Sequence, residues 1–269
     1  MNYLSQIKLP EKLDLYRIGL GFVKNKIKWD IKSEARTSRK ELSQLKNKYS
    51  GKKMVLLCNG PSLNKVDFQF LKDSGVFCVG LNKINLLFDR TDFRPDLIVS
   101  VNKLVIEQNA DFFNQTEIPI ILDSSAVNKI NKRKGVNFIY SLPFQLKFAG
   151  DVTGAVCQGY TVTYVALQVA FHLGFEEVAL VGCDHSFATK GSSNMTVTSG
   201  QSDPNHFSDK YFSGGMKWQL PDLLGSEIHY KMAKEYYESK GRKIFNCTEG
   251  GLLEIYERKD LKEFINEGK

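Results

Sequence analysis

The chain has 269 residues, of which 42% are hydrophobic and 25% are charged, and its formal net charge is +7. This composition excludes disordered and fibrous proteins and suits one large domain with a full hydrophobic core. We expect a cytoplasmic protein, because the sequence has neither an apolar run long enough to cross a bilayer nor a signal-peptide pattern. Five widely spaced cysteines indicate reduced thiols and offer no zinc-ligand spacing, so no metal site is expected.

Basic charge is concentrated in the first 53 residues, which contain fourteen Lys or Arg and five Asp or Glu. Apolar residues such as Tyr16, Phe22 and Trp29 are interleaved with lysines there, as in a segment that lies on an anionic membrane surface. A helix that packs on its own domain, or on a second copy of the chain, is the alternative. We expect residues 1–50 to form a basic amphipathic arm and residues 51–269 the catalytic domain. The remainder is slightly acidic and has no nucleic-acid module, so no nucleic-acid partner is expected.

From residue 54 onward, apolar strand-like runs alternate with helix-compatible segments, most clearly Thr163–Leu173 and Ser226–Lys240. The expected strands are Val55–Cys58, Val76–Gly80, Leu97–Val101, Pro119–Leu122, Val136–Tyr140, Glu177–Val181 and Lys243–Asn246. Such alternation predicts an α/β fold with a doubly wound, mostly parallel, Rossmann-like sheet. Its ligand should bind at the carboxyl ends of the strands.

The first expected strand ends in the turn Asn59-Gly60-Pro61-Ser62, which favours a nucleotide as the ligand. Gly60 would let the backbone approach the ligand closely, and Ser62 can cap the next helix while offering its hydroxyl. The turn lacks both G-x-G-x-x-G and the P-loop pattern. An ordinary strand-to-helix turn is the alternative.

Polar residues recur at the ends of later strands: Asn82 after the second, Asn102 after the third, and Asp184 with His185 after the sixth. Repeated Asn suits a site that binds sugar hydroxyls and base edges without adding charge. Taken singly, each Asn is better explained by a loop or helix cap, so the interpretation depends on their repetition.

A long segment rich in Gly, Ser, Thr, Asn and Asp, about residues 188–224, predicts a lid over the site. His206 lies in its middle, and imidazole is well suited to take a proton from an acceptor hydroxyl near neutral pH. A solvated or turn-capping histidine is the alternative. Near the C-terminus, Thr248 and Glu249 follow the last strand and could bind hydroxyls or phosphate, or form a plain turn.

These motifs resemble, in their order, those of metal-independent bacterial sialyltransferases. The pattern is also similar to the broader group that contains motility accessory factors of flagellin glycosylation and archaeal hydroxymethylpterin pyrophosphokinases. The likeness covers about residues 52–250 and rests on Asn59 to Leu63, Asn82, Asn102, Thr161, the segment His172 to Val178, Gly182-x-Asp184 and His206.

The resemblance implies a Rossmann-like fold with a small lid and a CMP-activated nonulosonic acid as donor. It implies inverting transfer to a sugar hydroxyl, with His206 as general base. It also places Asn59, Ser62, Asn82 and Asn102 around the nucleotide and the donor.

Two departures from the sialyltransferase pattern concern the donor and the leaving group. Thr161 is kept, but Val162 stands where that family has a donor-recognising serine. Ser186 stands where the family has a tyrosine whose hydroxyl contacts the departing phosphate. Stabilisation of that phosphate then falls to His185, Ser186, Lys190 or a metal held by Asp184. Asp184 and His185 could also form a hydrogen-bonded pair that only tethers the loop.

Three hypotheses follow. The first is a glycosyltransferase without a cofactor that extends a cell-surface glycan or lipid-linked saccharide, such as a lipopolysaccharide, at the inner membrane face. The second is a pyrophosphokinase that moves diphosphate from ATP to a pterin-like alcohol and requires Mg²⁺. The third is a non-catalytic nucleotide-binding module at a membrane surface.

Overall fold

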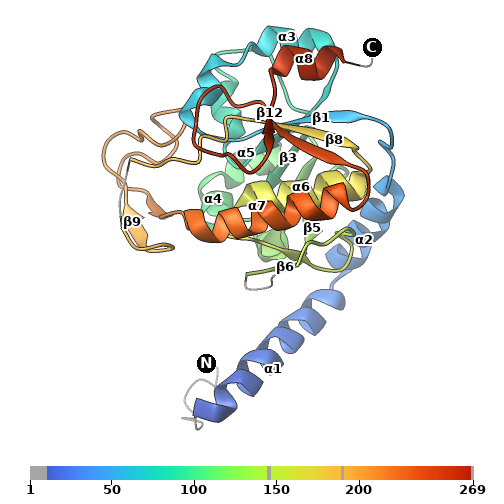
Figure 1. Cartoon of the computed structure of the whole chain (residues 1–269). Coiled ribbons are helices and arrows are strands. Elements are labelled where there is room, and N and C mark those ends of the chain that lie inside the picture. Colours follow the sequence, from blue (N-terminus) through green and yellow to red (C-terminus); the bar gives the residue numbers. More distant parts are fainter. Residues whose placement is uncertain (1–10, 144–146, 189–190, 268–269) are drawn as a thin grey trace.

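A central parallel sheet organises the chain in the computed structural model, which describes residues 11–143, 147–188 and 191–267 (Figure 1). The eight strands of this sheet lie in the order β12-β11-β8-β1-β2-β3-β4-β5, and each neighbouring pair is parallel. This confirms the expected doubly wound, Rossmann-like fold.

The seven expected strands are confirmed, with differences only at their ends. They are β1 (Lys53–Leu57), β2 (Phe77–Leu81), β3 (Leu97–Ser100), β4 (Ile120–Asp123), β5 (Val136–Ile139), β8 (Glu177–Val181) and β11 (Lys243–Asn246). The eighth strand, β12 (Glu257–Arg258), was not expected because both of its residues are exposed and charged, so no apolar run marks it.

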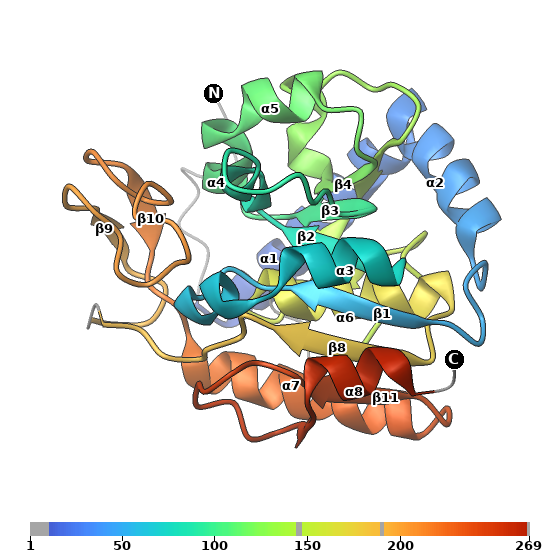
Figure 2. The same ribbon diagram turned by 90° about the horizontal axis from the view of Figure 1, so that it is seen from above.

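Helices cover both faces of the sheet. The α-helices of the domain are α2 (Ser33–Leu45), α3 (Phe68–Ser74), α4 (Lys103–Gln108), α5 (Ala110–Gln115), α6 (Val162–Leu173), α7 (Leu223–Glu238) and α8 (Leu261–Asn266). Helices α6 and α7 pack on one face, and α3, α5 and α8 pack on the other (Figures 1 and 2). Alternate residues of β1 follow this division, since Met54 and Leu56 belong to the first core and Val55 and Leu57 to the second.

Short elements complete the described part of the chain. They are the 3-10 helices η2 (Pro61–Lys65), η3 (Ile84–Leu87) and η4 (Ser124–Asn128), the parallel pair β6 (Ser141–Leu142) and β7 (Val156–Cys157), and the antiparallel pair β9 (Thr196–Thr198) and β10 (Lys217–Gln219). The pair β9–β10 stands at the side of the domain in Figure 2, within the expected lid.

The N-terminal region consists of two helices with different surroundings. Helix α2 lies along the edge strand β5, where the Ser38 hydroxyl accepts a hydrogen bond from the Phe138 N–H at 3.0 Å. Helix α1 (Glu11–Asp30) projects away from the domain and is held near its end by the buried Trp29 (Figure 1). Within the described residues, no helix is both long and apolar enough to cross a membrane.

Candidate active site

A cavity of about 510 Å³ lies at the carboxyl ends of the central strands, as expected for this class of sheet. Loops after β1, β2, β3 and β8, the start of α6 and the segment 191–224, which we call the lid, all contribute to its wall. Nine of the candidate residues named from the sequence line it: Asn59, Gly60, Asn82, Asn102, Thr161, Asp184, His185, Ser186 and His206. Of the others, Lys190 lies outside the described residues, and Ser62, Thr248 and Glu249 do not line the cavity.

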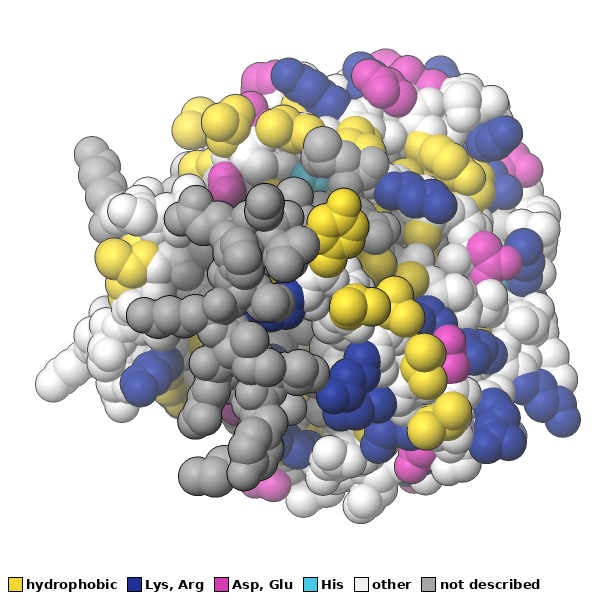
Figure 3. All heavy atoms as spheres, turned by 90° about the horizontal axis from the view of Figure 1, so that it is seen from below, with side chains coloured by type: hydrophobic (Ala, Val, Ile, Leu, Met, Phe, Trp, Pro, Cys, Tyr) yellow, Lys and Arg dark blue, Asp and Glu magenta, His cyan; other side chains and the backbone are white. Residues whose placement is uncertain are grey.

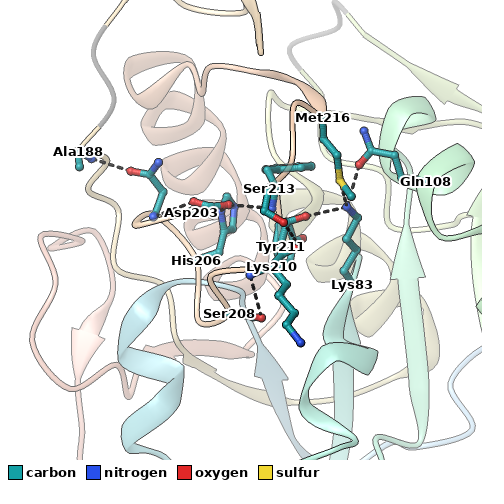
Figure 4. Close-up of polar contacts among 12 residues, drawn as sticks. Lys83, Gln108, Ala188, Asp203, His206, Ser208, Lys210, Tyr211, Ser213 and Met216 are labelled. Carbon is teal, nitrogen blue, oxygen red and sulfur yellow. Dashed lines mark hydrogen bonds and ion pairs between the residues drawn. The ribbon is translucent and has the colours of Figure 1, made fainter. Parts of the chain in front are cut away.

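His206 is paired with a carboxylate that the sequence interpretation did not identify. Its Nδ1 lies 2.7 Å from Oδ2 of Asp203, whose side chain is almost fully buried (Figure 4). The carboxylate accepts further hydrogen bonds from the backbone N–H groups of Asn205 and Phe212. Because an ionised carboxylate only accepts, Nδ1 of a neutral His206 carries the proton and Nε2 presents a lone pair.

Aromatic rings of the lid fix the plane of the His206 imidazole. The ring stacks on Tyr211 with centroids 4.1 Å apart and an angle of 2° between the planes. Phe212 lies edge-on to the imidazole and stacks on Trp218. Since all these rings line the cavity, the lid forms an aromatic wall around a positioned imidazole.

Asn82 supports this wall from the end of β2. Its Oδ1 accepts a hydrogen bond from the Ser100 hydroxyl at 3.0 Å, and its side chain also hydrogen-bonds the Tyr211 hydroxyl. Burial raises the pKa of that hydroxyl, and the hydrogen bond from Asn82 partly offsets the rise. The backbone of Asn82 is left-handed, with φ of 51°, a conformation that Asn tolerates better than most residues. Asn82 therefore contacts the ring on which His206 stacks.

Asn59 brings an unused polar group to the cavity. Its Oδ1 is buried and has no hydrogen-bond partner among the described residues. An unpaired buried acceptor costs about 1–3 kcal/mol, a cost that a ligand donor would remove. The Asn59 carbonyl accepts a hydrogen bond of 2.9 Å from the N–H of Phe207, the residue after His206. This bond holds the lid histidine beside the end of β1.

Gly60 and Ser62 both lie against the carboxylate of Asp184. A Cβ at Gly60 would lie 2.0 Å from Oδ2 of Asp184, so this glycine makes room for a carboxylate of the protein itself. The same oxygen accepts hydrogen bonds from the Ser62 hydroxyl at 2.7 Å and the Ser62 N–H at 3.2 Å. The expectation that Ser62 caps a helix is wrong, because its hydroxyl is turned to Asp184 and η2 has no side-chain cap.

His185 is the second histidine of the cavity. Its Nε2 lies 3.0 Å from Oε1 of Glu227 on α7, and its backbone is left-handed with φ of 53°. The hydrogen bonds of Asp184 go to Ser62, so each member of the expected Asp184–His185 pair has a separate partner. Both histidines of the cavity thus hydrogen-bond a carboxylate, each through a different ring nitrogen.

Helix caps account for two further candidates. Asn102 accepts hydrogen bonds from the N–H groups of Leu104 and Val105 and so begins α4, which is the alternative considered for it. Thr161 caps α6 through the N–H of Thr163. Both side chains still line the cavity, whereas Ser186 is an exposed lining residue.

The C-terminal candidates, Thr248 and Glu249, bond other residues of the protein and do not line the cavity. The Thr248 hydroxyl accepts a hydrogen bond from the Cys183 N–H at 3.0 Å. Glu249 is exposed and pairs with Lys65 at 2.9 Å. In the described part of the chain, no three His, Cys, Asp or Glu side chains are grouped so that they could hold a metal ion.

A buried lysine that the sequence interpretation missed attaches the lid to the domain. Nζ of Lys83 lies 2.8 Å from Oε1 of Gln108 and 2.7 Å from the carbonyl oxygen of Tyr211 (Figure 4). It also lies 4.8 Å from the centroid of the Phe212 ring. Burial lowers the pKa of Lys83 to about 8, and Asp203 opposes this effect.

Comparisons with known proteins place the chain in a family. No curated protein matches the sequence. The structure of MAf glycosyltransferase from Magnetospirillum magneticum AMB-1 is similar, with a TM-score of 0.51 and 14% identity over 84% of this chain and 38% of that chain. At this identity the likeness shows the fold, and this chain spans well under half the length of that protein. Residues 31–190, more than half of the chain, match the family described as 6-hydroxymethylpterin diphosphokinase MptE-like. This match confirms the resemblance to the group of pyrophosphokinases and motility accessory factors, and the chain belongs to the MptE-like family.

Proposed function

We propose that the chain is a glycosyltransferase that moves a sugar from a nucleotide-activated donor to a saccharide hydroxyl. The observation that carries this proposal is the His206–Asp203 pair, stacked on Tyr211 at a cavity that also contains the unpaired amide oxygen of Asn59. A base and a neutral polar group in one cavity suit the activation of a hydroxyl beside a bound nucleotide. The name of the structurally similar MAf glycosyltransferase agrees with this function.

In the proposed reaction, Nε2 of His206 accepts the proton of the acceptor hydroxyl while its oxygen attacks the anomeric carbon. The bond between that carbon and the donor phosphate breaks, and the nucleotide leaves with the electron pair. The Asp203 carboxylate keeps the imidazole in the required tautomer and stabilises the imidazolium that forms. Asn59 binds the nucleotide, and the donor is a CMP-linked acidic sugar.

His185 is the proposed stabiliser of the leaving phosphate. It lines the same cavity, and its Nε2 is occupied by Glu227, so its other ring nitrogen remains for a ligand. An imidazolium held by a carboxylate can donate a hydrogen bond to the developing phosphate charge. In this proposal His185 takes the role that a tyrosine hydroxyl has in the sialyltransferases that the sequence resembles.

A diphosphokinase is the second candidate, because the matching family carries that name. This reaction would transfer diphosphate from ATP to a pterin-like alcohol with Mg²⁺. His206 would again activate the attacking hydroxyl. The two candidates therefore differ in the donor and in the requirement for metal, and share the proposed base.

The test measures CMP release from CMP-N-acetylneuraminic acid, with lactose as acceptor and EDTA present. His206→Ala should lower turnover by ~10²–10⁴ and leave CMP affinity nearly unchanged, because the base acts on the acceptor. Asp203→Asn should also lower turnover, since an amide can impose the wrong imidazole tautomer.

Lys210→Ala is the matched control, because Lys210 is an exposed lid residue near His206 in the sequence. Near-normal turnover of His206→Ala would contradict the base assignment. Formation of AMP from ATP with a hydroxymethylpterin and Mg²⁺, without CMP release, would favour the diphosphokinase. CMP binding without turnover on either substrate pair would identify a binding module.

A further inference from the structure

Helix α1 carries an exposed row of large apolar side chains. Tyr16, Leu20, Val23 and Ile27 follow one another at spacings of four, three and four residues, which places them on one face of a helix. Their exposed fractions are 71%, 70%, 56% and 56%. We call these four residues the apolar stripe. A row of large exposed apolar side chains on one helix face is typical of an interaction surface.

The last turn of α1 already contacts the domain. Trp29 is buried, and Asp30 forms ion pairs with Lys26 and with Arg39 of α2. Arg39 also donates a hydrogen bond to the Thr153 carbonyl, so the end of α1 is fixed to the domain. The helix therefore leaves the domain in a set direction, away from the sheet (Figure 1).

Basic residues border the apolar stripe. Lys24 and Lys28 are exposed; Lys24 lies within four residues of three stripe members, and Lys28 directly follows Ile27. The acidic Asp30 is occupied by Lys26 and Arg39. Figure 3 shows the face toward which α1 projects, where hydrophobic and basic side chains lie next to one another. An apolar stripe with a basic border matches an interfacial helix on anionic lipid.

We propose that α1 binds the surface of an anionic membrane, with the apolar stripe in the headgroup region and Lys24 and Lys28 at the lipid phosphates. Charge decides between this partner and a second copy of the chain. A second helix docked on the same stripe brings further lysines to it, whereas anionic lipid neutralises them. The proposal is independent of the reaction in the cavity.

The test is sedimentation of the full chain with vesicles of phosphatidylcholine alone or with 30% phosphatidylglycerol. Binding should require the anionic lipid and should weaken as salt shortens the screening length from about 8 Å to about 3 Å. Lys24→Gln with Lys28→Gln should lower the partition coefficient on the order of 25-fold, at roughly fivefold per basic residue. Leu20→Glu with Ile27→Glu should lower it at least as strongly, because the stripe loses apolar area and gains negative charge.

Leu224→Glu is the matched control, since Leu224 is as exposed as Leu20 (71% against 70%) but lies on α7. It should bind vesicles like the wild type. Circular dichroism checks that each variant is folded. Equal binding to both vesicle types, or unchanged binding of both double variants, would overturn the proposal. A dimer without lipid that Leu20→Glu with Ile27→Glu dissociates would assign the stripe to a second copy instead.

Discussion

The two cavity histidines differ in the ring nitrogen that the protein occupies. Asp203 holds Nδ1 of His206, while Glu227 holds Nε2 of His185. The imidazoles therefore present opposite nitrogens to a ligand, Nε2 from the lid and Nδ1 from the loop after β8. One cavity can thus place one imidazole at an attacking hydroxyl and another at a leaving phosphate.

His185 provides a test of this division of roles. His185→Ala should lower turnover of the CMP-linked donor about 10²-fold, because the leaving phosphate loses a hydrogen-bond donor. His185→Gln should lower turnover less than His185→Ala does, since the amide retains an N–H that can reach the same region. Steady-state kinetics of both variants with saturating acceptor would measure the difference. Equal turnover of wild type and His185→Ala would remove the residue from the mechanism.

At the residue scale, the sequence predicted which residues line the cavity better than it predicted their hydrogen-bond partners. His206 and Asn59 were named because a lid histidine and a strand-end amide have recognisable positions. Asp203 was missed because it lies in an irregular segment where no periodicity marks a side-chain contact. Glu227 was missed because only the fold brings α7 to the loop after β8.

The lid is an element fastened to the domain at separate points. The Phe207 N–H bonds the Asn59 carbonyl, Lys83 bonds the Tyr211 carbonyl, and Gln108 bonds the Lys217 carbonyl. The described lid packs Phe212 and Trp218 into the core on one face of the sheet. The part that bears His206 is therefore held in place in this structure.

Lys83 makes stability depend on pH. Its pKa falls from the usual value near 10.5 to about 8, so the cost of burying its charge is fully present below pH 8. The cost is relieved as pH rises from about 8 to 10.5, where the unfolded chain binds more protons at this site. The free energy of unfolding of wild type minus that of Lys83→Met should therefore rise across this window, by on the order of 1–3 kcal/mol.

Urea unfolding at a series of pH values would measure this difference. Subtraction is needed because buried tyrosines and cysteines, whose pKa values are raised, lower stability over the same range. Lys210→Met, at an exposed lid position, is the control and should parallel the wild type. Parallel curves for wild type and Lys83→Met would show that Lys83 titrates normally.

At the element scale, apolar runs predicted the strands because both faces of a parallel sheet are buried. All four residues from Met54 to Leu57 are fully buried, as this argument requires. The two-residue β12 is an edge strand with charged side chains, so its place in the sheet depends on pairing with β11. The capping role of Asn102 also shows that a polar strand end can serve the next helix and the cavity together.

At the scale of the whole molecule, nucleotide binding measured without turnover can distinguish the two proposed donors. CMP should raise the melting temperature without Mg²⁺, by roughly 5–10 °C at 100 times its Kd. Asn59→Ala should weaken CMP binding by about 1–2 kcal/mol, since a buried partner is left unpaired. Thermal melting with CMP, CDP, UDP, GDP and ATP, with and without Mg²⁺, measures these effects.

Asn25→Ala is the control for the binding measurement, because Asn25 is exposed on α1 and does not line the cavity. Its melting temperature with CMP should rise like that of the wild type. A melting temperature that rises only with ATP and Mg²⁺, and not with CMP, would contradict the CMP-linked donor. Unchanged CMP affinity of Asn59→Ala by calorimetry would remove Asn59 from the nucleotide site.

The strand order also bears on how the protein is made. Strands β1 to β5 form one continuous half of the sheet, and β8 joins it only on the far side of β1. While the ribosome is still adding the residues before Glu177, β1 is the outer strand of that half and has no neighbour on its β8 side. An open apolar edge of this kind pairs readily with other chains. We therefore expect aggregation to compete with folding until Glu177–Val181 has emerged and paired with β1.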